Sequence, residues 1–513
     1  IGFTLGSSSL KATQTSHSEE TRASTIGSVL GNVDIQAGKD LTIRGSDVVA
    51  GQDINLIGQN VNILAAQNEN RSEQTYKSKT SGLTLALSGS VGSALDAGYQ
   101  TAKQAHDEDD SRLSALQGIK AGLTGVQAWQ ASQQGTEGGG ASQFFGISAS
   151  LGSQQSSSKQ TQQQSVSQGS SLTAGNNLSI LATGSGAVGQ DGDIHVQGSQ
   201  LKAANDLLLA ANRDITLEAA ANTQKLDGKN KSSGGAIGVS LGFDGEGHGG
   251  LSIFANANQG AGKEKGSGTT WSETTLDAGS QVKLVSGRDT ALKGAQVNGE
   301  QIVANVGRDL TLQSLQDSDY YDSKQKNVSA GASVAIFGTG GSANFSASQS
   351  KIDSNYQSVQ EQTGLYAGKG GFQIDVGNHT QLDGSVIAST ADADQNRLST
   401  GTLGWSSLDN KADYKSQQQS VSLSSGSDGK GQFISNMPSG MLVAYNHGDS
   451  ASGTTGSAIS NGTIEVRDTA HQQQDVASLS RDVEHANGSI SPIFDKEKEQ
   501  NRLQQVQLIA EIG

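Results

Sequence analysis

The sequence predicts an all-β protein: a right-handed parallel β-helix solenoid with projecting antiparallel β-hairpins, a small helical insertion near 93–134 and a C-terminal helix. Three observations lead to this class. The chain has 68 Gly but only 2 Pro among 513 residues, and Pro is excluded from inner strands because it removes a ladder donor. A short strand motif recurs along the chain, and four segments interrupt it in a similar way.

The recurring motif is a turn followed by Asp or Asn, an aliphatic residue, any residue and a second aliphatic residue. It reads "AGKDLTI" at 37–43, "AGQDINL" at 50–56 and "VGRDLTL" at 306–312. Strands of about five residues do not stand alone, and their regular spacing suits a solenoid in which each coil pairs with the next. The crossover rule predicts right-handed coils. A β-sandwich of equally short strands is the alternative.

Each turn places Asp or Asn where its side chain can bond the local backbone. Stacked coils would bring these residues into ladders along the outside of the solenoid. Alternation places Leu41 and Ile43 inside and Thr42 outside. The Asp residues of the turns are therefore interpreted as structural, and not as acid–base pairs.

Four segments break the motif, near 66–172, 221–275, 315–365 and 405–435. They combine polar arms rich in Ser, Lys and Gln with an apolar hairpin, as in "GAIGVSLGF" and "GLSIFANAN". The candidate residues for contact with a membrane or a partner are the apolar residues of these hairpins: Leu83, Leu85, Leu87, Phe145, Ile147, Leu151, Ile237, Val239, Leu241, Phe243, Leu251, Ile253, Val334, Ile336 and Phe345.

The apolar hairpin strands are expected to run about eight residues, or roughly 26 Å. This length is close to the height of the apolar band of an outer-membrane barrel. The alternation of apolar residues with Gly, Ser or Asn along each strand is the pattern of a barrel wall. A single hairpin cannot span a bilayer, because its edges leave backbone groups unpaired. Several hairpins could pair edge to edge, or add to the open edge of a host barrel. Alternatively, they bury their apolar faces on the β-helix or on one another.

Helical structure is expected in two places, with 93–106 a shorter partner helix in the first of them. The first interruption carries Leu113, Leu116, Ile119, Leu123, Val126 and Trp129 at helical spacing. From Asp495 onward, Leu503, Val506, Ile509 and Ile512 share one helical face.

No chemistry of a catalytic or metal site is evident. The chain has no Cys, and its 8 His are isolated, with His106 and His248 the nearest to metal candidates. The formal net charge of −15 argues against binding to nucleic acid, and no apolar run approaches the length of a membrane helix. We expect no enzymatic activity, no cofactor and no metal. A polysaccharide-active β-helix enzyme is the minor alternative.

The coils "AGKDLTIRGSDVVAGQDINLIG", the hairpins and the junction "QDVASLSRDVEHANGSISPIFDKEKEQNRLQQVQLIAEIG" together resemble the contact-dependent growth inhibition effectors of the filamentous haemagglutinin family. The resemblance implies the second haemagglutinin-type repeat region of such a protein over 1–460 and the start of its pretoxin domain over 461–513. It also implies a secreted protein on the surface of a Gram-negative cell. Its partners would be a secretion partner in the outer membrane, the outer membrane of a neighbouring cell and a barrel protein there. The region would help a C-terminal toxin to cross.

The first residues, "IGFTLGSSSL", resemble the second strand of a hairpin, so we expect a fragment of a longer chain. A rigid adhesin stalk is the alternative function, since it needs the coils but not the hairpins.

Overall fold

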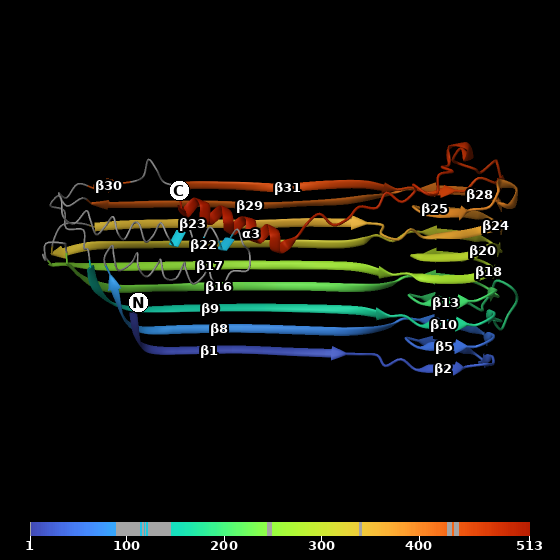
Figure 1. The fold of residues 1–513 in the computed structure, drawn as a ribbon, viewed down its shortest axis with the longest axis horizontal. Helices are drawn as coiled ribbons and strands as arrows, with labels where there is room; N and C mark the ends of the chain where they lie inside the picture. The colour runs from blue at the N-terminus through green and yellow to red at the C-terminus, as the bar shows by residue number, and fades with distance from the viewer. Residues whose placement is uncertain are drawn as a thin grey trace.

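The structure is a computed structural model that describes residues 2–88, 113–114, 117, 120–121, 145–243, 249–337, 341–427, 433–435 and 441–512. It has two parts, a β-helix of short strands and a broad sheet of long strands that projects from one side of it (Figure 1). The predicted all-β class with projecting antiparallel strands is confirmed. No helix among the described ranges is both long and apolar enough to cross a membrane.

Each coil of the β-helix has three strand positions, and every coil pairs in parallel with the next, which excludes the sandwich. The first position is occupied by β2 (Thr25–Ser28), β5 (Asp47–Ala50), β10 (Ser171–Ala174), β13 (Gln200–Ala203), β26 (Val386–Ser389) and β32 (Ala458–Ile459). The second is occupied by β3 (Val33–Gln36), β6 (Ile54–Gly58), β11 (Leu178–Ala182), β14 (Leu207–Ala211), β27 (Arg397–Thr400) and β33 (Thr463–Val466).

Three longer strands cover the first two positions together: β18 (Thr274–Ser286), β20 (Ala295–Val306) and β24 (Gly364–Val376). The third position forms a separate sheet of β4 (Asp40–Arg44), β7 (Asn60–Leu64), β12 (Ile194–Gln197), β15 (Ile215–Glu218), β19 (Thr290–Lys293), β21 (Asp309–Gln313), β25 (His379–Asp383) and β28 (Thr402–Ser406). Parallel pairing reaches β33, a few residues beyond residue 460, and the division into a repeat region and a junction stays a prediction.

The interior of the β-helix is a stack of aliphatic side chains. Ile54 and Leu56 lie beneath Leu178 and Ile180 of the next coil, and all four are fully buried. Outside, the predicted ladders are present. Asp40 accepts a hydrogen bond from Asn60, Arg288 bonds Asp214 of the coil before it, and Asn378 bonds Asp309 in the same way.

Alternate coils close differently at one corner. At four of these corners a Gly with positive φ makes the turn into the next coil, and these residues are Gly45, Gly198, Gly294 and Gly384. At the intervening corners, after β7, β15, β21 and β28, the chain leaves the coil and returns as a pair of long strands. The four insertions therefore leave from equivalent corners.

The long strands form one ten-stranded antiparallel sheet, which we call the arm sheet. Its strands are β1 (Gly2–Glu19), β8 (Ala66–Ser88), β9 (Phe145–Gln168), β16 (Ala220–Phe243), β17 (Gly249–Ser272), β22 (Asp317–Phe337), β23 (Gly341–Ser358), β29 (Leu408–Ser427), β30 (Phe433–Ser435) and β31 (Met441–Thr455). The expected strand length of about eight residues is wrong, because β16 and β17 each have 24 residues. The polar arms are themselves strand, since neighbouring arms satisfy their backbone groups.

The spacing of the insertions explains why the arms join into one sheet. Adjacent strands, and adjacent coils of parallel strands, are both about 4.8 Å apart. Two coils therefore advance about 9.6 Å along the solenoid, and a two-stranded insertion occupies about 9.6 Å in a sheet. An insertion at every second coil fills the space to its neighbour without a gap, as the pairing of β9 with β16 and β17 with β22 shows (Figure 1).

The helices are few. Two short 3-10 helices, η1 (Ala393–Gln395) and η3 (Val476–Ser478), lie in turns, and the predicted C-terminal helix is α3 (Lys496–Ile512). Most of the helical insertion predicted at 93–134 lies outside the described residues. Leu113, Ser114, Gln117, Lys120 and Ala121 are described and are helical.

Candidate membrane-facing surface

The register of the arm sheet places the apolar hairpin residues on one face. Residues directly opposite in an antiparallel pair share a face, and residues two apart along a strand share it too. Leu83 lies opposite Leu151, and Leu151 lies opposite Ile237. One row along, Val239 lies opposite Ile253.

The apolar residues of the strands thus form one band across the sheet, which we call the apolar stripe: Phe3, Leu5, Leu83, Leu85, Leu87, Ile147, Leu151, Ile237, Val239, Leu241, Leu251, Ile253, Val334, Phe345, Val421, Leu423 and Leu442.

Three of the predicted residues have a special position. Phe145 and Phe243 lie opposite one another in register. Ile336 lies at a β-bulge, because Ser252 is opposite Ala335 whereas Leu251 is opposite Phe337. All the other predicted residues belong to the stripe.

Sequence reasoning missed stripe residues at both sides of the sheet, namely Phe3 and Leu5 on β1 and Leu442 on β31. The alternation in "GFTLG" was a usable signal for the first two.

The stripe is open to solvent. Ile237 and Leu151 are each 67% exposed and Val334 is 65% exposed, whereas the inward-facing aliphatic residues of the β-helix, such as Ile54 and Leu178, are buried. Leu87 and Leu251 are half-buried. Exposed apolar areas of this kind are typical of surfaces that bind a protein or a membrane.

The opposite face of the arm sheet is polar and carries α3. Leu503 of α3 packs against Tyr321 and Ile352 in a small apolar cluster. Glu264 bonds Lys496 of α3 and accepts a hydrogen bond from the Tyr321 hydroxyl at 2.8 Å.

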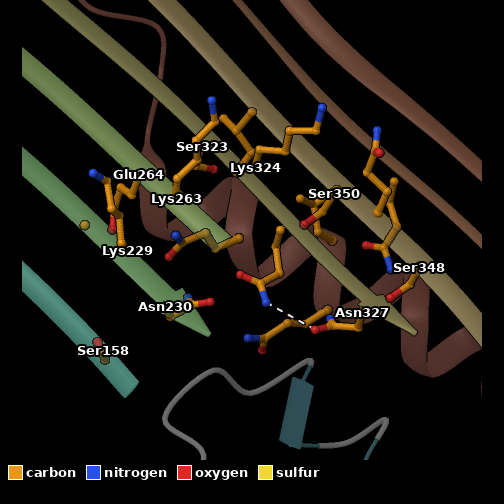
Figure 2. Close-up of a pocket in the computed structure, with 18 of the residues that line it drawn as sticks. Ser158, Lys229, Asn230, Lys263, Glu264, Ser323, Lys324, Asn327, Ser348 and Ser350 are labelled. Atoms are coloured by element: carbon orange, nitrogen blue, oxygen red, sulfur yellow. Dashed lines mark hydrogen bonds between the residues drawn. The ribbon is translucent and has the colours of Figure 1, made fainter. Parts of the chain in front are cut away.

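A buried carboxylate fixes α3 on this face. Glu499 is 2% exposed, and it accepts hydrogen bonds from Ser416 at 2.7 Å and Arg502 at 2.6 Å. A polar cavity of about 440 Å³ lies beside the helix, lined by Asn327 and Gln504 among others. Figure 2 shows the side chains of neighbouring strands that border it.

The lysines of the long strands all lie on one face of the arm sheet. The long strands contain fourteen, and the register places all of them on the stripe face: Lys11, Lys77, Lys79, Lys159, Lys225, Lys229, Lys231, Lys263, Lys265, Lys324, Lys326, Lys351, Lys411 and Lys415. Lys263 illustrates the geometry, since the adjacent Glu264 points to α3 and Lys263 therefore points away. The signal that sequence reasoning missed is a Lys-x-Lys pattern, as in "KSK", "KNK", "KEK" and "KQK".

On the same face, nearer to the β-helix, acidic residues form ion pairs with two of these lysines. Lys159 contacts Glu73 at 2.8 Å, and this hydrogen bond lowers the pKa of the Glu73 carboxyl. Lys351 contacts Asp353 at 2.7 Å, which raises the pKa of the Lys351 ammonium group. Burial, and then a hydrogen bond shared with Asp353, raises the pKa of the Asp322 carboxyl.

Asp carboxylates in the turns of the coils form ion pairs between neighbouring coils. Asp193 and Asp214 each pair with an Arg of the following coil, Arg213 and Arg288. Within the described part of the chain, no cluster of three His, Asp or Glu side chains has the arrangement of a metal site. The two metal candidates of the sequence, His106 and His248, lie outside the described residues.

Known proteins resemble this chain over its whole length. The chain is 54% identical over 514 residues to a deoxyribonuclease CdiA of Yersinia pseudotuberculosis, covering 100% of this chain and 47% of the relative. It is 50% identical to a tRNA nuclease CdiA of Escherichia coli strain NC101 and 51% identical to a 16S rRNA endonuclease CdiA of Enterobacter cloacae. Both alignments cover 100% of this chain, and they cover 16% of the Escherichia coli relative and 15% of the Enterobacter cloacae relative. The chain thus spans less than half of the length of each of these relatives, and no solved structure matches it.

A family model described as the hemagglutinin repeat matches residues 5–139 and 151–328, which is more than half of the chain. The matched residues include coils of the β-helix and the arms up to β22. The chain belongs to the hemagglutinin-repeat family and is similar throughout to CdiA proteins.

Proposed function

We propose that this chain is a non-catalytic region of a secreted toxin-delivery protein of contact-dependent growth inhibition. The region associates with the outer membrane of a neighbouring Gram-negative cell and helps a C-terminal toxin to cross. The full-length protein is exported by a secretion partner in the outer membrane and displayed on the cell surface.

The comparison of relatives supports a shared, non-catalytic role. The three relatives are named for activities on DNA, tRNA and 16S rRNA, yet each aligns with this chain at 50% identity or more. A region common to proteins that act on different nucleic acids serves a step that they have in common. Delivery is such a step.

The exposed apolar stripe carries the proposal. It lies at the end of the arm sheet away from the β-helix, where the strands reach farthest from the solenoid (Figure 1). Its apolar run on β16, Ile237 to Leu241, spans roughly 13 Å at about 3.3 Å per residue. The residues between them on the other face are Gly and Ser, which is the dyad pattern of a strand that meets lipid on one side. The stripe therefore meets the membrane of the neighbouring cell, either lying on it or joining a barrel within it.

Protease protection tests this proposal. The fragment is mixed with outer-membrane vesicles, and segments 234–243 and 328–337 are expected to become resistant to cleavage. A variant with Val239→Asp and Val334→Asp places charges on the stripe and should lose both protection and toxin delivery by the full-length protein. Val49→Asp, at a residue 43% exposed on the outside of the β-helix, is the matched control. Unchanged cleavage together with normal delivery by the double variant would refute the proposal.

The parallel β-helix alone favours a second candidate, a rigid adhesin stalk. A stalk holds a binding tip away from the cell and needs only the stacked coils. Under this function the double variant would deliver toxin normally, because the stripe would have no role.

A further inference from the structure

We propose that ten lysines beside the apolar stripe bind the phosphate groups of an anionic lipid surface and set the depth at which the stripe enters it. These residues, which we call the lysine belt, are Lys11, Lys77, Lys79, Lys159, Lys229, Lys231, Lys263, Lys324, Lys326 and Lys351. The inference rests on the proposed function and adds the chemistry of the lipid that is recognised.

The centre of the belt is a row of five lysines on five adjacent strands. Lys159 lies opposite Lys229, Lys229 opposite Lys263, Lys263 opposite Lys324, and Lys324 opposite Lys351. Strands are about 4.8 Å apart, so the row presents five ammonium groups at intervals close to that spacing. Figure 2 shows three of these residues on neighbouring strands.

Such a row is unfavourable in the free protein, since like charges directly opposite one another destabilise a sheet. Among the described residues, only two members of the row form ion pairs, Lys159 with Glu73 and Lys351 with Asp353. The three rows that make up the belt contain no acidic residue. This stands out in a chain whose formal charge is −15. An anionic ligand would relieve the repulsion.

The belt adjoins the stripe on the same face, so that one surface offers both. Lys79 is four residues from Leu83 on β8, or about 13 Å. A groove of about 340 Å³ is lined by Lys326 together with Val328, Val421 and Leu442. Lysine can extend its apolar stem along such a surface and keep its ammonium group at the level of lipid headgroups.

The composition of the belt favours a lipid surface over nucleic acid. Proteins that bind single strands combine positive charge with aromatic side chains on which bases stack. The three rows of the belt contain no aromatic residue, and their other members are Ser, Thr, Gln, Asn, Ala, Val and Leu. The adjacent stripe is mostly aliphatic, with Phe3 and Phe345 its aromatic members, and this composition suits acyl chains.

Vesicle binding tests the inference. The chain is added to vesicles of phosphatidylcholine, with or without phosphatidylglycerol, and to phosphatidylcholine vesicles made anionic with a fatty acid instead. We expect tighter binding to the phosphatidylglycerol vesicles than to either of the others, and a weaker effect in high salt. Inorganic phosphate alone should not compete at the concentration of the vesicle phosphate, because one ion meets few of the lysines.

The belt variant changes Lys159, Lys229, Lys263 and Lys324 to Gln, which removes each charge and leaves a polar side chain that is one atom shorter. Its affinity for the phosphatidylglycerol vesicles should fall by about 100-fold or more, since one lysine near an anionic surface contributes roughly a fivefold factor. The matched control changes Lys225, Lys265, Lys411 and Lys415 to Gln. It removes the same charge from the same face outside the belt and should bind nearly as the original chain does. Circular dichroism checks that both variants keep their strand content.

Three results would overturn the inference: equal losses in the two variants, equal binding of the original chain to neutral and anionic vesicles, or preferential binding to single-stranded DNA. Equal binding to all vesicles would leave the proposed function standing, because the stripe alone would explain it. Failure to bind any vesicle or outer membrane would refute the proposed function as well.

Discussion

Neutralising one lysine in the middle of the row should stabilise the arm sheet, contrary to the usual effect of changing a folded protein. Lys229 lies between Lys159 on β9 and Lys263 on β17. At about 5 Å in water, each like-charged neighbour costs roughly 0.8 kcal/mol. Lys159 is partly compensated by Glu73 at 2.8 Å, so the expected gain from Lys229→Gln is about 1 kcal/mol at low salt.

Hydrogen exchange of backbone amides is the appropriate assay, since it reports the local opening of β16 and not the unfolding of the whole solenoid. At low salt, amides in 223–235 should exchange about fivefold more slowly in Lys229→Gln. The gain should nearly disappear in 1 M salt, where the Debye length is about 3 Å. Lys225→Gln is the control, because Lys225 lies opposite Gln163 and Ser267. Equal changes in both variants, or a gain that does not depend on salt, would refute the electrostatic reasoning.

The β-helix and its attachments yield four further predictions. Leu209 is fully buried, so Leu209→Ala should lower the free energy of unfolding by about 2–5 kcal/mol, which a lower unfolding temperature would show. Gly198 has a φ of 54° and a Cβ there would lie 2.4 Å from the Ala220 Cβ, so Gly198→Ala should destabilise the coil corner, measured by hydrogen exchange. Leu503→Ala should release α3, so that limited proteolysis cuts within 496–512 while the β-helix stays intact. Burial raises the pKa of Glu273 to about 7, so ionisation of this carboxyl lowers the stability of the fold as the pH rises from 4.5 through 7. Glu273→Gln should therefore raise the free energy of unfolding by about 1 kcal/mol at pH 8, after allowance for solvent screening, but not at pH 4. Thermal unfolding at the two pH values measures this difference.

Much of the architecture follows from local sequence. The motif around Leu41 and Ile43 specifies short strands with one buried face, and a repeat of such strands can bury that face only by stacking. Asp40 and its equivalents lie at turns, where neighbouring coils bring them together in ladders. The alternation of Ile237, Val239 and Leu241 likewise predicted a strand with one apolar face.

Sequence reasoning was less successful where a residue's partner is distant in the chain. The polar arm that contains Lys229 has no apolar pattern, so it gives no local signal for a strand. It becomes one because the arms on both sides supply hydrogen-bond partners along its whole length. The contact of Lys496 with Glu264 joins residues 232 positions apart and could not be inferred from either segment.

The sequence by itself determined which residues of each strand share a face, because side chains alternate along a strand whatever it pairs with. Only the tertiary structure decided how the faces of different strands align. The four insertions leave every second coil, and two coils advance by the width of two strands, about 9.6 Å. That equality joins separate hairpins into one sheet, and the register between them turns isolated lysines and isolated leucines into a continuous belt and a continuous stripe.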